Sequence, residues 1–194
     1  SGSFTLAPLG DVSSKTGAQL EADSITAGVT SFFRPEDGAW DTVNPNRFYF
    51  QTTNNVTSPS RLWALDFVDP TDPTKGGTIT ALLDGTEGQR MLDNLAVTKA
   101  GSFLPTGTTI NLEDVGNNVR NGRIWSYDPA TDKAVQIAWH DPARFGNDVT
   151  AATAPFTQDE ESSGVIDVTS LFGNANTNAF LIVDQAHYAI ATPG

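Results

Sequence analysis

The chain has 194 residues and a formal net charge of −12, with 11 Lys and Arg residues against 23 Asp and Glu residues. Such an acidic surface repels nucleic acid and anionic lipid, so we expect neither as a partner. There are no cysteines, which excludes disulfides, thiolate nucleophiles and zinc–thiolate sites. The sequence has no run of 18 apolar residues, so we expect no membrane-spanning segment.

Short strand-like runs separated by turns rich in Gly, Pro and Asp predict an all-β fold. No window of a dozen residues keeps apolar positions at helical spacing, so we expect little helix. Residues 1–30 are expected to form a lead-in strand, and residues 148–155 an Ala- and Thr-rich loop. The expected strands are 47–53, 61–67, 77–83, 95–99, 108–112, 123–127, 134–139, 165–168 and 179–183.

Two segments look like copies of one structural unit. Residues 61–66 and 123–128 share the pattern Arg–apolar–Trp–x–apolar–Asp, and each is followed by a turn and a further strand-like run. A repeat of this kind is typical of a β-propeller blade, although short strands at this spacing also fit a β-sandwich. At about 40 to 50 residues per blade, we expect a single β-propeller-like domain over residues 1–194, with about three to four blades.

Acidic clusters lie next to the expected strands. Because neighbouring carboxylates repel one another, and because calcium takes carboxylate, amide and carbonyl oxygens as ligands, we expect a calcium site assembled from several loops. Asn94 and Asn117 could add amide oxygens to it. The spacing matches no EF-hand or RTX motif, and hydrated surface acids of a very acidic protein explain the same residues. The clusters are Glu36–Asp37, Asp93–Asn94, Glu113–Asp114 and Asp159–Glu160–Glu161.

Four further residues carry candidate chemistry. Arg34 and Arg123 lie near acidic clusters, where each could hold an anion or form a local salt bridge, the salt bridge being preferred for Arg123. His187 could bind a metal, carry a proton or serve as a hydrogen-bonded structural residue. His140 ends an expected strand before a turn, where we expect a capping role.

Taken together, these motifs resemble the PhoX-type alkaline phosphatase family. The likeness extends over residues 31–190 in the family's order. It rests on RPEDGAWD at 34–41, FYFQTT at 48–53, RLW at 61–63, DNL at 93–95, EDVGN at 113–117, RIWSYD at 123–128, DEESSGVID at 159–167 and DQAH at 184–187. The resemblance implies an exported bacterial β-propeller, either secreted, periplasmic or extracellular, whose central acidic cluster holds calcium and, in characterised members, iron.

For the site, the resemblance implies that these metals bind and polarise a phosphate ester, which is hydrolysed by metal-assisted attack. Arg34, Asn117 and His187 become candidate catalytic or phosphate-contacting residues. Two departures stand out: the iron-binding members use a cysteine ligand, which is missing here, and this chain is much shorter than a full member. The candidate metal ligands are Glu36, Asp37, Asp93, Glu113, Asp114, Glu160 and Glu161.

We therefore expect an exported metal-dependent phosphatase acting on phosphate monoesters. The alternative is a non-catalytic calcium-binding extracellular protein, in which metal ions rigidify loops and bridge subunits. Such a protein would self-assemble or associate with a missing portion of the propeller. A sugar- or lactone-directed propeller hydrolase would also suit an acidic centre, but not this set of motifs.

Overall fold

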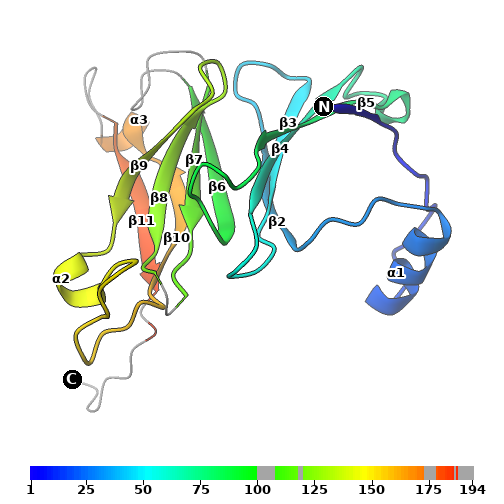
Figure 1. Cartoon of the computed structure of the whole chain (residues 1–194). Coiled ribbons are helices and arrows are strands. Elements are labelled where there is room, and N and C mark those ends of the chain that lie inside the picture. Colours follow the sequence, from blue (N-terminus) through cyan, green and yellow to red (C-terminus); the bar gives the residue numbers. More distant parts are fainter. Residues whose placement is uncertain (100–107, 118–119, 173–177, 186, 188–194) are drawn as a thin grey trace.

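The computed structural model describes residues 1–99, 108–117, 120–172, 178–185 and 187. Strands predominate and form three antiparallel sheets, none of which closes on itself (Figure 1). The predicted all-β class is therefore confirmed. Within the described residues, no helix is both long and apolar enough to cross a membrane.

The first sheet is a meander of consecutive antiparallel strands with one added edge strand. Four strands follow one another in chain order, and the N-terminal strand then pairs with the last of them. In spatial order the strands are β1 (Gly2–Phe4), β5 (Gly77–Leu83), β4 (Arg61–Phe67), β3 (Arg47–Thr52) and β2 (Pro35–Trp40).

The second sheet repeats this four-stranded meander, and the third is a pair of strands. All nine strands expected from the sequence are present, with bounds that differ by a few residues. The second sheet consists of β6 (Leu92–Lys99), β7 (Thr108–Asp114), β8 (Arg123–Asp128) and β9 (Lys133–Trp139). The third consists of β10 (Glu161–Asp167) and β11 (Phe180–Gln185).

The expected lead-in strand is wrong for most of residues 1–30, because α1 (Gly17–Thr26) is a helix. A capping box starts it: Gln19 N donates to Thr16 Oγ1 at 3.3 Å, and Thr16 N donates to Gln19 Oε1 at 2.8 Å. No residue of α1 is buried, so the helix lacks the apolar stripe that a periodicity search detects. The remaining helices are short: η1 (Pro73–Lys75), α2 (Pro142–Phe145) and α3 (Thr169–Phe172).

The repeated Arg–apolar–Trp segments occupy equivalent positions in the first two sheets. They form β4 and β8, each the third strand of its meander. In both, the register shifts directly before the tryptophan, between Leu62 and Trp63 and between Ile124 and Trp125. The two meanders therefore share the same strand order and the same position of the register shift, directly before the tryptophan.

A second irregularity recurs in the first strand of both meanders and of the third sheet. The register shifts between Pro35 and Gly38 in β2, between Leu92 and Leu95 in β6, and between Ser163 and Ile166 in β10. Such bulges bend a strand and redirect its side chains. In β2 and β6 the bulges contain acidic residues, so these acids belong to strands and not to the loops expected from the sequence.

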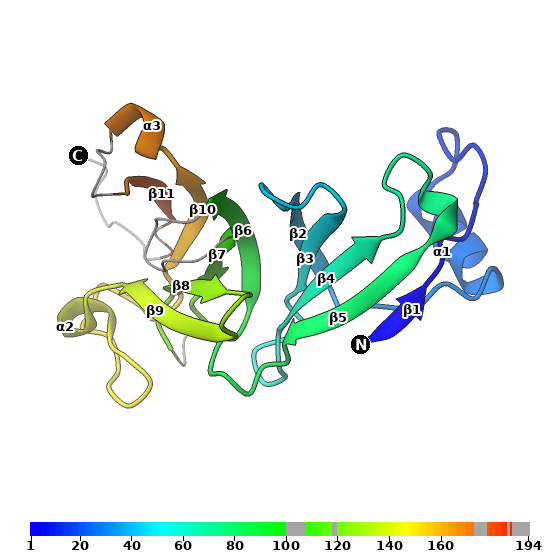
Figure 2. The same cartoon turned by 90° about the horizontal axis from the view of Figure 1, so that it is seen from above.

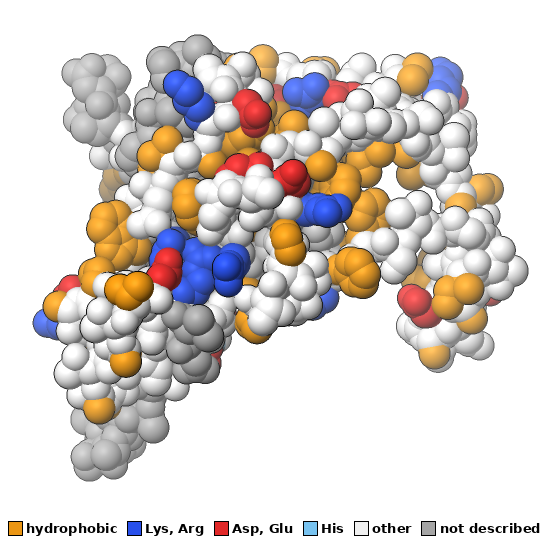
Figure 3. Space-filling view, viewed as in Figure 1, with side chains coloured by type: hydrophobic (Ala, Val, Ile, Leu, Met, Phe, Trp, Pro, Cys, Tyr) orange, Lys and Arg blue, Asp and Glu red, His pale blue; other side chains and the backbone are white. Residues whose placement is uncertain are grey.

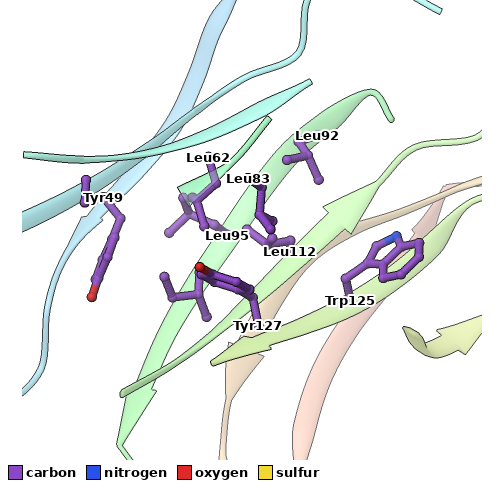
Figure 4. Packing of buried hydrophobic residues seen from close by; sticks show 10 residues of the cluster. Tyr49, Leu62, Leu83, Leu92, Leu95, Leu112, Trp125 and Tyr127 are labelled. Atoms are coloured by element: carbon purple, nitrogen blue, oxygen red, sulfur yellow. The ribbon is translucent and has the colours of Figure 1, made fainter. Parts of the chain in front are cut away.

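The three sheets stand side by side, with β6 between β2 and β10 (Figure 2). The first two sheets pack through one buried cluster (Figure 4). It includes Tyr49, Leu62 and Leu83 from the first sheet and Leu112 and Tyr127 from the second. This packing fixes the spacing of the first strands, where the acidic bulges lie.

Candidate functional site

Acidic side chains from all three sheets lie near one another where β2, β6 and β10 are neighbours. Two belong to the bulge of β2, one to the bulge of β6, one to the end of β7, and one begins β10. We call this group the acidic cluster; it consists of Glu36, Asp37, Asp93, Glu113 and Glu161.

Hydrogen bonds join the strands that carry the cluster. Asp37 Oδ2 accepts a bond from Leu95 N at 3.1 Å, which links β2 to β6. Asn94 Nδ2 donates to Glu113 Oε2 at 2.5 Å and to Ser163 Oγ at 3.3 Å, which links β6 to β7 and β10. A single amide therefore holds together the strands of two sheets.

Glu113 is the most deeply buried member of the acidic cluster. Its side chain is fully buried, and its Oε1 has no hydrogen-bond partner among the described residues. Burial raises the pKa of Glu113 to about 8, and the charges of Asp93 and Glu161 add to this, although the bond from Asn94 opposes it. A carboxyl group in this setting is protonated at neutral pH unless a cation takes the place of the proton.

Asp93 lies in the bulge of β6 between the other acids. Its pKa is raised by burial first, then by the negative charges of Glu36 and Asp37, while Arg34 opposes the shift. The pKa values of two neighbouring carboxyl groups, Asp93 and Glu113, are thus both raised, because burial and nearby negative charges oppose their ionisation.

Arg34 is the positive residue that stands beside the cluster. Its backbone lies in the left-handed region, with φ of 54°, which is uncommon for a residue with a side chain. Its Nη2 lies 3.3 Å from Glu36 Oε1, and its Nη1 lies 3.5 Å from Asn54 O. More than half of the side chain is exposed, so the guanidinium has donors left for a ligand.

Glu160 and His187 form a separate contact at the edge of the cluster. Glu160 is buried, and both its oxygens accept hydrogen bonds, Oε1 from Thr157 Oγ1 at 3.0 Å and Oε2 from His187 N at 2.7 Å. His187 Nδ1 lies 3.5 Å from Asp159 Oδ2. Burial raises the pKa of Glu161, and a positive charge on His187 opposes this rise. The geometry gives Glu160 a structural role and leaves Glu161 as the member that faces the cluster.

Asp114 lies apart from Glu113, although the two are adjacent in sequence. Its Oδ2 accepts bonds from Arg120 Nη2 at 2.8 Å, Trp125 Nε1 at 2.9 Å and Arg90 N at 3.1 Å. Burial raises the pKa of Asp114 to about 6 despite these donors, so it is charged at neutral pH. No sequence pattern indicated a role for Arg120, because its burial depends on how the β7–β8 connection folds.

Asn117 also lies in the β7–β8 connection, where its N donates to Arg120 O at 3.1 Å. This connection packs tightly on the segment before β10: a Cβ at Gly116 would meet Glu160 O at 2.4 Å and Gln158 O at 2.5 Å. The connection therefore helps to position the start of β10. The backbone hydrogen bond places Asn117 beside Arg120.

The other two candidate residues contact acidic side chains. His140 Nε2 lies 2.9 Å from Asp184 Oδ1, which ties the end of β9 to β11. Arg123 pairs with Asp148, the salt-bridge role preferred from the sequence, although Asp148 belongs to a later loop.

The acidic cluster has the right donor chemistry for a hard cation. All its side-chain donors are oxygens, Asn94 supplies an amide beside them, and Glu113 Oε1 is buried without a partner among the described residues. In the part of the chain that the structure describes, no three His, Cys, Asp or Glu side chains stand close enough to hold a metal ion as they are. Binding a cation here would require these side chains to move closer together.

A cavity of about 270 Å³ lies on the first sheet and is lined in part by Phe33, the residue before Arg34. Its lining includes Phe33, Asn54, Arg61 and Trp63, and Asn54 is the residue whose carbonyl Arg34 contacts. The cavity is aromatic on one side and carries a cation, so it could accept an organic group joined to an anion bound at Arg34.

Comparisons with protein-family models, with curated proteins and with solved structures found no match for this chain. The resemblance to PhoX-type phosphatases therefore stays a prediction from the quoted motifs.

Proposed function

We propose that this protein is an exported, calcium-dependent phosphatase acting on phosphate monoesters, and that its sheets are blades of a β-propeller. The propeller interpretation is supported by two four-stranded meanders with equivalent bulges, packed face to face. It is also supported by the contacts of β6 with β2 and β10, since first strands of successive blades are neighbours around a propeller axis.

One observation carries the proposed activity: the unpartnered, buried Oε1 of Glu113, beside Asp93 and Glu161. Leaving a buried polar oxygen unsatisfied costs about 1 to 3 kcal/mol. Such a cost is understandable where a ligand completes the site. Negatively charged oxygen donors suit hard cations such as calcium, and the absence of cysteine speaks against the iron site of the family.

In this proposal Asp37, Asp93, Glu113 and Glu161 hold the cation, which supplies the positive charge that polarises a phosphate ester. Arg34 binds the phosphate through its free guanidinium donors. Glu36 accepts from Arg34 at 3.3 Å and so keeps the guanidinium at the cluster. The organic part of the ester lies in the adjoining cavity, between Phe33 and Trp63.

The test is hydrolysis of p-nitrophenyl phosphate by the purified chain, with calcium and after EDTA treatment. Arg34→Lys keeps the charge but loses the planar fork, so we expect kcat/KM to fall about tenfold or more. Glu113→Gln should abolish calcium-dependent activity. Arg144→Lys is the matched control, because Arg144 is largely exposed on α2, and it should leave the rate unchanged.

Two results would count against the proposal in different ways. Folded protein that neither hydrolyses the ester nor gains thermal stability with calcium would overturn both the metal site and the activity. Calcium stabilisation without hydrolysis would instead favour the assembly protein. That alternative rests on apolar side chains exposed on the third sheet, including Ile166, Leu181 and Val183, and it predicts calcium-dependent oligomers in light scattering.

A further inference from the structure

Three arginines lie together at one end of the second sheet. Arg90 precedes β6, Arg120 lies in the β7–β8 connection, and Arg123 begins β8. Figure 3 shows a compact group of Lys and Arg side chains in this region, with an acidic side chain at its edge. The concentration is unusual on a chain with only 11 such residues and a net charge of −12.

The three guanidinium groups act on one another electrostatically. Burial lowers the pKa of Arg120 first, and the positive charges of Arg123 and Arg90 lower it further, while Asp114 and Asp148 oppose the shift. Arg120 cannot move away, because its Nη2 binds Asp114 Oδ2 at 2.8 Å and its Nη1 donates to Gly88 O at 3.3 Å. The positive charge is therefore fixed in place.

Two carboxylates do not balance three guanidinium groups. Asp114 accepts three hydrogen bonds through one oxygen and is fully buried. Asp148 is more than half exposed and pairs with Arg123. Arg90 has no ion-pair partner in the described part of the chain. One positive charge is left over, close to the exposed end of the group.

One buried hydrogen-bond donor in this group of arginines, Arg120 Nε, is left without an acceptor in the described part of the chain. Arg120 Nε has no hydrogen-bond partner among the described residues, and the Arg120 side chain is only 5% exposed. Asp148 Oδ1 lies 3.9 Å from this nitrogen, which is too far for a hydrogen bond. An oxygen placed between Arg120 Nε and Arg123 would satisfy this donor.

We propose that Arg90, Arg120 and Arg123 form a binding site for a tetrahedral oxyanion such as inorganic phosphate, and that the Asp148 carboxylate partly occupies this site in the free protein. Planar guanidinium groups bind such anions through paired hydrogen bonds. The ligand brings several oxygens, so it can reach Arg120 Nε and Arg90 where the single carboxylate of Asp148 does not. The site is separate from the acidic cluster and does not depend on the proposed function.

The proposal makes opposite predictions for two kinds of substitution. Arg90→Gln and Arg123→Gln each remove a charged donor and should weaken phosphate binding about tenfold, because each loses a charge-assisted hydrogen bond to the anion. Asp148→Asn removes the competing carboxylate and should strengthen it by about threefold or more. A network of purely structural salt bridges would give no phosphate binding in any of these proteins.

The experiment is calorimetric titration of the whole chain with inorganic phosphate at constant ionic strength, in EDTA so that no metal ion contributes. Arg144→Gln is the control for loss of a surface arginine and should bind as the parent does. Sulfate should compete with phosphate, and chloride at equal ionic strength should not. Circular dichroism and a melting curve verify that each variant is folded.

The outcomes separate this site from the acidic cluster. Arg90→Gln and Arg123→Gln should weaken phosphate binding in EDTA while keeping the stabilisation by calcium, which reports on the acidic cluster. Absence of saturable phosphate binding by the parent chain, or weaker binding by Asp148→Asn, overturns the proposal, whatever the phosphatase assay shows.

Discussion

Glu113 and Asp114 are neighbours in β7, yet their carboxylates engage opposite faces of the second sheet. Glu113 meets Asn94 and the acidic cluster, whereas Asp114 meets Arg120 and Trp125. Burial raises the pKa of both, to about 8 for Glu113 and about 6 for Asp114. Because successive side chains of a strand point to opposite faces of the sheet, Glu113 belongs to the candidate cation site and Asp114 to an internal salt bridge.

Stability in EDTA should fall as the pH rises from 4.5 to 8. Glu113 has its ordinary pKa of 4.5 when unfolded and about 8 when folded, so over this window the folded state binds more protons and loses stability with increasing pH. The slope from this group is at most about 1.4 kcal/mol per pH unit. Urea unfolding at several pH values measures it. Glu113→Gln should flatten the slope and be the more stable protein at pH 9; parallel profiles for the two proteins would contradict this.

Calcium should raise the melting temperature, and more so at pH 8.5 than at pH 6.5, because the cation must displace the proton of Glu113. At a calcium concentration 100 times the Kd the gain is about 2.7 kcal/mol. Differential scanning fluorimetry with calcium and with EDTA measures the shift. Glu21→Gln on the exposed face of α1 should respond as the parent does, and Glu113→Gln should not. An equal shift in all three proteins would place calcium elsewhere.

Asp114→Asn should destabilise the chain by about 3 to 5 kcal/mol, because it leaves the buried charge of Arg120 without its partner. Asp66→Asn provides the comparison. This substitution breaks the salt bridge between Asp66 and Arg47, two side chains that are each about one-third exposed. It should lower the free energy of unfolding by about 1 kcal/mol or less. Chemical denaturation measures the free energy of unfolding of both variants. Similar losses would mean that the buried Asp114–Arg120 salt bridge contributes no more than the exposed pair.

Gly116→Ala should destabilise the packing of the β7–β8 connection against the segment before β10. The added Cβ would lie 2.4 Å from Glu160 O and 2.5 Å from Gln158 O, both backbone atoms that cannot rotate away. We expect a loss of about 1 to 3 kcal/mol, as for other overpacked sites. Gly17→Ala adds a methyl group with no atom within 4 Å at the start of α1, and it should be neutral or slightly stabilising. A melting-temperature series distinguishes them, and a harmless Gly116→Ala would show that the connection can shift.

The strands could be predicted from the sequence because their signals are local. Alternation and turn residues marked all nine expected strands, and the shared tryptophan motif placed β4 and β8 as counterparts. The helix α1 was not predicted, because it buries none of its residues and so has no apolar periodicity. Its only sequence signal is the capping box at Thr16 and Gln19.

The site was harder to predict, because it depends on register and on contacts between sheets. The acids at positions 36, 37 and 93 were expected in loops but lie in strand bulges, and a bulge leaves no local signal in an acidic run. The separation of Asp114 from Glu113 follows from strand alternation and was open to prediction once β7 was extended to Asp114. The burial of Arg120 was not, since it is created by residues from distant segments.

The bulge that β2, β6 and β10 share has a consequence for how such a protein diversifies. When a four-stranded unit is duplicated, the copy inherits a pair of positions already turned toward its neighbours. Changing the chemistry of the acidic cluster then needs only point substitutions at those positions, with no redesign of the backbone. At these positions β2 holds Glu36 and Asp37, β6 holds Asp93 and Asn94, and β10 of the two-stranded sheet holds Gly164 and Val165.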